Sequence, residues 1–348
     1  MSLAMDSTML FVGTQSFNNQ TSYFQIDENG LWSRWILNRP VQKYDESQFQ
    51  YVALSPLFAV SGLSGGVFAY NRSQMWGKPT LLTVTGATES YGYPISMSGN
   101  ILAVENFGKP LSIFTYDQKK KKWSSPVSIT VPTPNRKNNH QKSQKSRRSL
   151  RIAQDLLTDQ YVSLSGKILA VGQGGGWSGD GSIPESDGVV YMYQLDNNTN
   201  KWKLQTTLNR TPLVGINADA PYVSLSGQNL AVYFANNSLT MFRQSESSWN
   251  FVQNILMNGG SFFASFSVYQ DTLVAATNKV SVYTRSPSSG QWSVSKTISI
   301  PKWNDDYMQG KGPSRIGDVK LYNKTIALSV YYQSSYGQSP GVIYQIKI

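Results

Sequence analysis

A short motif recurs seven times along this 348-residue chain, and this repetition restricts the fold more than any other feature. The copy at residues 161–171 reads Tyr-Val-Ser-Leu-Ser-Gly-Lys-Ile-Leu-Ala-Val, and similar copies begin at residues 51, 94 and 222. Weaker copies begin at residues 2, 265 and 318. Each copy contains two short apolar segments with turn residues between them, which is the pattern of a β-hairpin. The sequence therefore predicts seven hairpins in succession.

A third apolar segment follows every hairpin, and a Trp follows six of these seven segments. The third segments lie at residues 23–26, 67–70, 111–116, 189–193, 239–242, 280–283 and 342–346. The tryptophans that open a fourth segment are Trp32, Trp76, Trp123, Trp202, Trp249 and Trp292. A twisted four-stranded sheet with two apolar faces is buried by packing between two similar sheets. We therefore predict an all-β fold, a seven-bladed β-propeller of four-stranded antiparallel blades, as a single domain over residues 1–348.

The seventh copy differs from the others because no Trp-bearing fourth segment follows residues 342–346. Residues 2–12 already supply the first two strands of the first blade. We therefore expect a last blade of three strands, unless the final residues fold differently. The outer edge of such a blade has unpaired backbone groups, to which a partner or a second copy of the chain would add a strand at residues 342–348. The alternative is that Lys347 and neighbouring charges make a three-stranded blade tolerable.

The segment from Val-Ser-Leu-Ser-Gly at residue 162 to Trp202 resembles the FG-GAP-like repeats of integrin-α-type propellers. The resemblance implies the propeller fold but not one function, because such repeats occur in proteins with different roles. Calcium loops of that family are rich in alternating Asp residues. The nearest segment here, residues 179–188, has carboxylates at Asp180, Glu185 and Asp187 without the alternating oxygen ligands. We interpret it as a Gly-rich turn and predict no metal site.

The composition argues against an enzyme. The chain has no Cys and a single His, which excludes thiol nucleophiles, zinc-thiolate sites and any mechanism with two imidazoles. A serine-type triad would have to use His140, which lies in a segment with the composition of disorder. Carboxylate pairs for glycoside hydrolysis are not evident among the loop acids. We therefore predict no catalytic residue and no cofactor.

The excess of basic residues is concentrated in one part of the chain. Residues 118–154 contain 11 Lys and Arg and no acidic residue, which equals the formal net charge of +11. The insert at 133–152 is predicted to be mobile, because its centre has almost no apolar residues. Its candidate polyanion-binding residues are Arg136, Lys137, Lys142, Lys145, Arg147, Arg148 and Arg151. An electrostatic arm, a nuclear-import-like cluster and a solvated loop are the three interpretations. Lys119 to Lys122 are predicted to form a separate hairpin tip.

Nearly all long segments belong to one class of connection, between second and third strands or between blades. These connections share one face of a propeller, so we expect that face to bind partners. Its loop aromatics are candidate partner-binding residues: Tyr44, Tyr91, Tyr93, Trp177, Trp303, Tyr307, Tyr332 and Tyr336. Such residues are common at protein interfaces and sugar-binding surfaces, although they could equally pack inside the propeller channel.

These observations predict a non-enzymatic protein–protein interaction platform or a structural component of a larger assembly. A propeller that binds polyanions or nucleic acid through residues 136–151 is the alternative, and a carbohydrate-binding propeller is the third. No apolar run is long enough to span a membrane, and the start lacks the pattern of a signal peptide. We therefore expect an intracellular protein or a component of an assembled particle.

Overall fold

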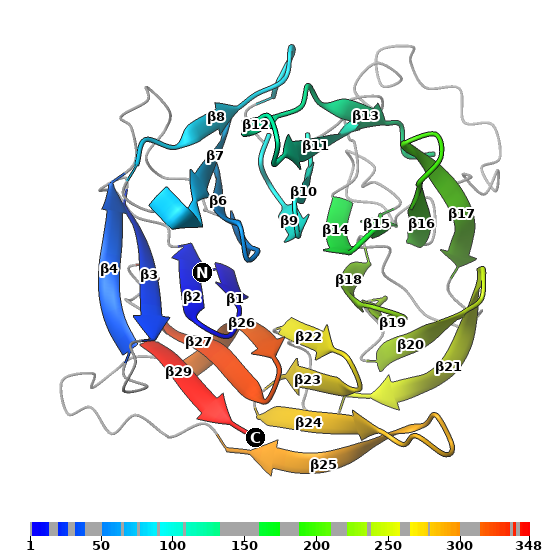
Figure 1. Ribbon diagram of the computed structural model, residues 1–348. Coiled ribbons are helices and arrows are strands. Elements are labelled where there is room, and N and C mark those ends of the chain that lie inside the picture. Colours follow the sequence, from blue (N-terminus) through cyan, green and yellow to red (C-terminus); the bar gives the residue numbers. More distant parts are fainter. Residues whose placement is uncertain are drawn as a thin grey trace, which may run out of the picture. The chain divides into compact units, whose positions relative to one another are not determined.

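The computed structural model describes residues 2–13, 20–26, 32–38, 51–63, 66–74, 77–88, 91–106, 109–132, 160–174, 188–209, 221–234, 238–257, 265–277, 279–299, 314–334, 337–338 and 342–348. These residues form seven antiparallel sheets, called blades 1 to 7 in chain order (Figure 1). The predicted all-β, seven-bladed fold is thereby confirmed. Contacts divide the chain into two compact units: unit 1 is Met1–Leu82 with Met257–Ile348, and unit 2 is Thr83–Leu256. A single domain over residues 1–348 stays a prediction.

Unit 1 contains blades 1, 2, 6 and 7. Blade 1 consists of β1 (Ser2–Met5), β2 (Met9–Gly13), β3 (Gln20–Ile26) and β4 (Trp32–Asn38). Blade 2 consists of β5 (Tyr51–Leu54), β6 (Phe58–Leu63), β7 (Gly66–Asn71) and β8 (Thr80–Leu82), with the short helix η1 (Arg72–Gln74) before β8. Blade 6 consists of β22 (Ser265–Tyr269), β23 (Thr272–Ala276), β24 (Val280–Arg285) and β25 (Trp292–Ile298). Blade 7 consists of β26 (Ser314–Tyr322), β27 (Thr325–Ser334), β28 (Gly337–Gln338) and β29 (Val342–Lys347).

Unit 2 contains blades 3, 4 and 5. Blade 3 consists of β9 (Ile95–Ser98), β10 (Ile101–Val104), β11 (Leu111–Asp117), β12 (Lys122–Trp123) and β13 (Val127–Ile129), and its outermost strand is divided between β12 and β13. Blade 4 consists of β14 (Gln160–Ser165), β15 (Ile168–Gln173), β16 (Val189–Asp196) and β17 (Lys201–Asn209). Blade 5 consists of β18 (Tyr222–Ser226), β19 (Asn229–Tyr233), β20 (Ser238–Ser245) and β21 (Ser248–Leu256).

The repeated motif forms the first hairpin of every blade, as predicted. In blades 4 and 5 the turns begin with Gly166 and Gly227, whose φ angles are 59° and 55°. Glycine adopts this left-handed region without the steric cost that a Cβ imposes. Blades 6 and 7 have Gln270 and Asn323 at the same position, with φ angles of 51° and 53°. The turn geometry therefore persists where the glycine does not.

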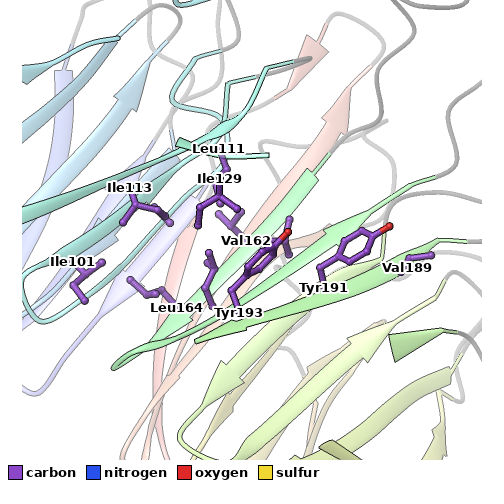
Figure 2. Close-up of a cluster of buried hydrophobic side chains, with 12 residues drawn as sticks. Ile101, Leu111, Ile113, Ile129, Val162, Leu164, Val189, Tyr191 and Tyr193 are labelled. Atoms are coloured by element: carbon purple, nitrogen blue, oxygen red, sulfur yellow. The ribbon is translucent and has the colours of Figure 1, made fainter. Parts of the chain in front are cut away.

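The apolar residues of unit 2 form cores between consecutive blades. The core between blades 3 and 4 contains Leu111, Ile113 and Ile129 from one blade and Val162, Tyr191 and Tyr193 from the other (Figure 2). The core between blades 4 and 5 combines Val190 and Met192 with Leu230, Val232 and Trp249. Burying one such side chain contributes about 1.5–3 kcal/mol. Both faces of blade 4 are therefore buried, which explains why β15 and β16 are almost uniformly apolar.

Unit 1 is assembled in the same way. Phe11 and Tyr23 of blade 1 pack with Val52 and Phe68 of blade 2. Blades 6 and 7 share a core that includes Val274, Val282, Ile326 and Leu328. Leu3 and Val12 of blade 1 pack with Ala327 of blade 7, and Ile343 lies against this cluster. Blade 7 is therefore covered by blade 6 on one face and by blade 1 on the other.

Blade 7 has three long strands, as predicted. β27 pairs with β26 on one side and with β29 on the other, and the two-residue strand β28 pairs only with the end of β27. Among the described residues, no strand pairs with the outer edge of β29 (Figure 1).

The tryptophans mark the outermost strands of the other blades. Trp32 and Trp292 are the first residues of β4 and β25, and Trp202 and Trp249 are the second residues of β17 and β21. Trp123 lies in β12. Trp76 is outside the described residues. Trp249 belongs to the core between blades 4 and 5, and Trp202 packs against the core between blades 3 and 4. Both support the prediction that these side chains contribute to packing between blades.

Candidate partner-binding surface

Two tyrosines at equivalent positions in blades 4 and 5 form an aromatic pair. Tyr161 and Tyr222 lie at the start of the innermost strands β14 and β18, where the connections between blades reach the sheets. Their ring centroids are 3.9 Å apart and their planes are inclined by 30°. Tyr222 is 39% exposed. This tyrosine pair therefore presents aromatic surface at the start of the innermost strands of blades 4 and 5.

Two hydrogen bonds between the innermost strands hold the pair in register. The Oγ of Ser163 accepts the N–H of Leu225 at 3.0 Å, and the Oγ of Ser165 accepts the N–H of Gly227 at 2.9 Å. Because both serines are in β14 and both donors are in or next to β18, these bonds join the second halves of the two strands. The same serine positions join blade 3 to blade 4, where Ser96 accepts from Leu164 at 2.9 Å.

Gly172 allows blade 5 to approach blade 4 directly behind the pair. Gly172 is the cross-strand partner of Tyr161 in β15. A Cβ at residue 172 would lie 1.9 Å from the carbonyl oxygen of Pro221. Pro221 immediately precedes Tyr222, so the absence of a side chain at residue 172 permits the close approach of the two strands that carry the tyrosines. Glycine is required here by close approach of the backbone.

Among the described residues, those next to the tyrosine pair in sequence and in strand pairing are uncharged. Tyr233 is the cross-strand partner of Tyr222, and its ring centroid is 6.4 Å from that of Tyr222. The residues next to the pair in sequence and in pairing are Gln160, Val162, Gly172, Pro221, Val223 and Tyr233. Aromatic rings with hydroxyl tips in an uncharged setting contact apolar or polar neutral groups by packing and hydrogen bonding.

The structure places three of the predicted partner-binding residues. Tyr91 is fully buried, and burial raises the pKa of its hydroxyl. Its assignment as a surface residue is wrong, because the loop that carries it folds back into the blade, where the N–H of Gly92 bonds to the carbonyl of Glu105 at 3.0 Å. Tyr93 is 38% exposed, which agrees with the expected location at the surface. The backbone of Tyr332 lies in β27.

The remaining predicted residues lie outside the described part of the chain. These are Tyr44, Trp177, Trp303, Tyr307 and Tyr336, together with all seven basic candidates from Arg136 to Arg151 and the segment 179–187. The separate basic tip is described: residues 118–121 form the turn between β11 and β12, and Asp117 accepts the N–H groups of Lys119 and Lys120 at 2.9 and 3.0 Å. These hydrogen bonds, the one from Lys120 first, lower the pKa of Asp117.

The described residues also show no feature of a metal centre or a membrane-spanning helix. Within them, no group of three or more His, Asp or Glu side chains lies together as a metal site would require. No helix in the described ranges is long and apolar enough to cross a membrane.

The tyrosine pair itself was missed by sequence reasoning. The repeat predicts Tyr161 and Tyr222 only as strand residues, and their shared position at the start of two copies is the one indication that they lie close together. Equivalent positions in consecutive blades are neighbours in a propeller, so repeated aromatics at the first motif position were a usable indication.

Comparison with solved structures identifies the class of fold. No family model matches the chain, and no curated protein matches it. The β-propeller domain of Cps50 (Swd1) from Myceliophteria thermophila is similar, with a TM-score of 0.60, 10% identity, and coverage of 100% of this chain and 95% of that one. A protein from Lactobacillus plantarum has a TM-score of 0.60 and 13% identity, covering 99% of this chain and 100% of that one. The WD40 repeats of RRP9 have a TM-score of 0.57 and 9% identity, covering 95% and 87%.

These similarities establish a β-propeller with WD40-type neighbours and nothing finer. The FG-GAP-like assignment is not supported, because no family model matches and WD40 repeats are among the similar structures. In total, 862 chains of solved structures match. A fold shared by so many proteins does not indicate one function. The function must therefore be argued from the residues of the candidate site.

Proposed function

We propose that this chain is a non-enzymatic protein-interaction platform that binds a partner at the tyrosine pair. The observation that carries the proposal is the exposed ring of Tyr222 against Tyr161, at the start of two neighbouring innermost strands. Exposed tyrosines held in fixed positions are typical of the centres of protein interfaces, because each gives a large contact area at little cost in side-chain entropy.

Rigidity of the site supports the proposal. The serine hydrogen bonds and the Gly172–Pro221 approach fix the two strands that carry the pair. A partner that contacts these rings therefore does not have to order them first, which reduces the entropy lost on binding. Tyr93 of blade 3, which is also exposed, is a further candidate contact. Tyr44, Trp177, Trp303, Tyr307, Tyr332 and Tyr336 complete the set of proposed contacts.

Affinity capture of the full chain from its native lysate tests this surface. The Tyr222→Ser variant removes the exposed ring, and we expect recovery of specific partners to fall at least about tenfold, as for loss of an interface anchor. Phe251→Ser is the matched control, because Phe251 is also an exposed aromatic, at 54%, but lies in the outermost strand β21. Equal recovery of the same partners by Tyr222→Ser and wild type would refute binding at the pair.

The basic insert supports a second candidate function, polyanion binding. Seven Lys and Arg lie between residues 136 and 151 without an acidic residue to balance them. Such a segment binds phosphates through counterion release, so affinity falls steeply with salt. Nucleic acid is the proposed polyanion.

Single-stranded RNA of mixed sequence is the probe for this candidate. Replacing the seven residues with Gln should abolish most binding at low salt and flatten its salt dependence. Replacing Lys119, Lys120, Lys121 and Lys122 with Gln is the matched control, since these residues are exposed at the tip of the hairpin between β11 and β12. If both variants lose binding equally, attraction is a property of the net charge and the insert is not a site.

We also propose that a partner reaches this chain by strand addition at residues 342–348. The outer edge of β29 supports this mode, because no strand of the described residues pairs with it. Both faces of β29 are packed, by Tyr344, Ile346 and Ile348 on one side and by Ile343 on the other. Backbone groups on a strand held this firmly form a ready template for pairing.

A further inference from the structure

The third strand of blade 7 is built to the same register as the third strands of the other blades. The N–H of Ile348 donates to the carbonyl of Lys324, the second turn residue of the first hairpin, at 2.9 Å. Four other blades contain the same bond, from Tyr116, Leu195, Gln244 and Arg285 to the second residue of their own hairpin turns, at 2.8–2.9 Å. Ile348 therefore occupies the position of these four residues.

In each of those blades the residue at this position pairs with the Trp of the fourth strand. The pairs are Tyr116 with Trp123, Leu195 with Trp202, Gln244 with Trp249 and Arg285 with Trp292. Blade 1 shows the same pairing between Ile26 and Trp32. By equivalence, a fourth strand beside β29 would begin opposite Ile348 and run antiparallel to β29.

An apolar side chain of β29 is more exposed than its counterparts in blades 2 to 6. The residues equivalent to Ile346 in blades 2 to 6 are between 2% and 7% exposed: Tyr70, Phe114, Tyr193, Phe242 and Tyr283. Ile346 is half-buried, as is Phe24 in blade 1. Ile346 and Ile348 pack against the core between blades 6 and 7. A Trp opposite Ile348 would lie on that same face, as Trp202 does on the core between blades 3 and 4.

The edge of β29 is also regular. Its pairing with β27 runs without a shift from Val342 to Lys347. The outermost strands of blades 4, 5 and 6 each contain a register shift opposite Tyr193, Phe242 or Tyr283. Such bulges discourage pairing with another strand, and β29 has none. Because the N–H of Ile348 points to β27, alternation along a strand directs the N–H groups of residues 343, 345 and 347 outward.

We infer that β29 binds an extended segment of a partner protein that begins with Trp opposite Ile348 and places a polar or acidic residue opposite Lys347. This inference deepens the proposed strand addition and rests on it. The chain's own fourth strands specify the Trp, and the positive charge of Lys347 favours a neutral polar or negative neighbour across the strands. Main-chain hydrogen bonds supply affinity and the Trp supplies specificity.

A fluorescent peptide with the sequence of residues 290–299, which contains Trp292, tests the inference on the full chain by anisotropy. We expect saturable binding that falls at least tenfold when the peptide carries Trp292→Ala. Gln345→Pro in the protein removes one outward N–H without breaking a bond to β27, and should weaken binding at least tenfold. Gln345→Ala is the matched control and should bind like wild type.

Hydrogen exchange on the wild-type chain provides a second measurement if Gln345→Pro fails to fold. Added peptide should slow exchange at residues 343, 345 and 347 and leave that of residues 344 and 346 unchanged. Equal affinity for the Trp and Ala peptides, or no binding at all, would overturn the inference. A dimer of the free chain that Gln345→Pro dissociates would assign the edge to a second copy instead. Tyr222→Ser should bind the peptide normally, which separates this test from that of the tyrosine pair.

Discussion

Gly166 lies in the turn before β15 and Gly172 lies within this strand, and the two glycines are required for different physical reasons. Gly166 has a φ of +59°, and a Cβ added there would meet no atom within 4 Å, so only the backbone conformation restricts this position. Gly172 has no left-handed φ, but a Cβ there would meet the carbonyl oxygen of Pro221 at 1.9 Å. Gly166 is therefore required by the conformation of a turn, and Gly172 is required by the short distance between blades 4 and 5.

The stability cost of Ala relative to Asn should therefore be opposite at these two glycines. Gly172→Ala should lower the free energy of unfolding by about 1–3 kcal/mol because the blades must separate, and Gly172→Asn should cost more. Gly166→Ala should cost about 1 kcal/mol and Gly166→Asn less, because Asn tolerates the left-handed region. Urea unfolding measures all four. The same order at both positions would contradict the assignment of separate causes.

Tyr193 should make stability depend on alkaline pH. Burial, and secondarily the neighbouring Tyr191, raises the pKa of Tyr193 to about 12. The pKa of Tyr193 in the folded protein is therefore above its usual value of about 10 in the unfolded chain. The contribution of the protonated Tyr193 to the free energy of unfolding is complete below pH 10 and is lost as the pH rises from 10 to 12. The urea midpoint of Tyr193→Phe should therefore fall less steeply over that range than that of wild type. Parallel curves for the two proteins would show that Tyr193 does not titrate differently on folding.

At the scale of single residues, the sequence shows where aromatic side chains occur in a loop but not which of them are buried. Tyr91 and Tyr93 stand two positions apart in one loop, yet one is fully buried and the other exposed. No periodicity distinguishes them, since they lie outside a strand. The path of the loop decides, through bonds such as that from Gly92 to Glu105.

At the scale of elements, serines of the repeated motif join neighbouring innermost strands. Ser163 accepts from Leu225, and in unit 1 Ser267 accepts from Leu321 at 3.1 Å. Strands that belong to different sheets have no ladder between them, so these side chains satisfy backbone donors that would otherwise face a neighbouring blade. The spacing of the serines in the repeated motif therefore serves contacts between blades as well as the hairpin.

Removing one such acceptor should loosen one junction. Ser163→Ala leaves the N–H of Leu225 without its partner and should cost about 1–3 kcal/mol of unfolding free energy. It should also accelerate hydrogen exchange at Leu225. Ser248→Ala, at an exposed position of β21, is the control and should change stability by less than about 0.5 kcal/mol. Unchanged exchange at Leu225 in Ser163→Ala would rule out this function of the serine.

Hairpins and strand order were predictable from sequence, because alternation and turn residues act over a few positions. The register shifts between β16 and β17 and between β20 and β21 were not. A bulge changes the pairing by one residue within an otherwise regular pattern, and its position depends on how the outermost strand twists over its neighbour.

At the scale of the whole molecule, Asp318 connects three blades of unit 1. Its carboxylate accepts the N–H of Leu3 at 2.9 Å and the hydroxyl of Ser265 at 2.7 Å. The register of β26 shifts between Ile316 and Val319, which places Asp318 at an irregular point of the strand. The N–H of Asp318 bonds to Ser329 at 2.8 Å. The N-terminal strand β1 is thereby fastened to blades 6 and 7.

Asp318→Ala should therefore destabilise the junction of β1 with the last blade. We expect a loss of about 1–3 kcal/mol of unfolding free energy and faster hydrogen exchange at Leu3. Lys320→Ala is the control: its ammonium lies 3.5 Å from Asp318 at a partly exposed position and should contribute less than about 1 kcal/mol. If both variants lose the same stability, charge pairing rather than hydrogen bonding to β1 is the main contribution.

The sequence by itself determined the seven blades, the first hairpin of each, the Trp at the start of the outer strands and the three-stranded last blade. These features follow from alternation, turn chemistry and repetition, which act locally along the chain. Only the tertiary structure decided that Tyr161 stacks on Tyr222, that Gly172 faces Pro221 and that Asp318 bonds to Leu3. Each of these contacts joins residues many positions apart, as the separation of 315 residues between Leu3 and Asp318 shows. Such pairs meet only after the blades have packed, because their distance depends on backbone positions in two sheets at once.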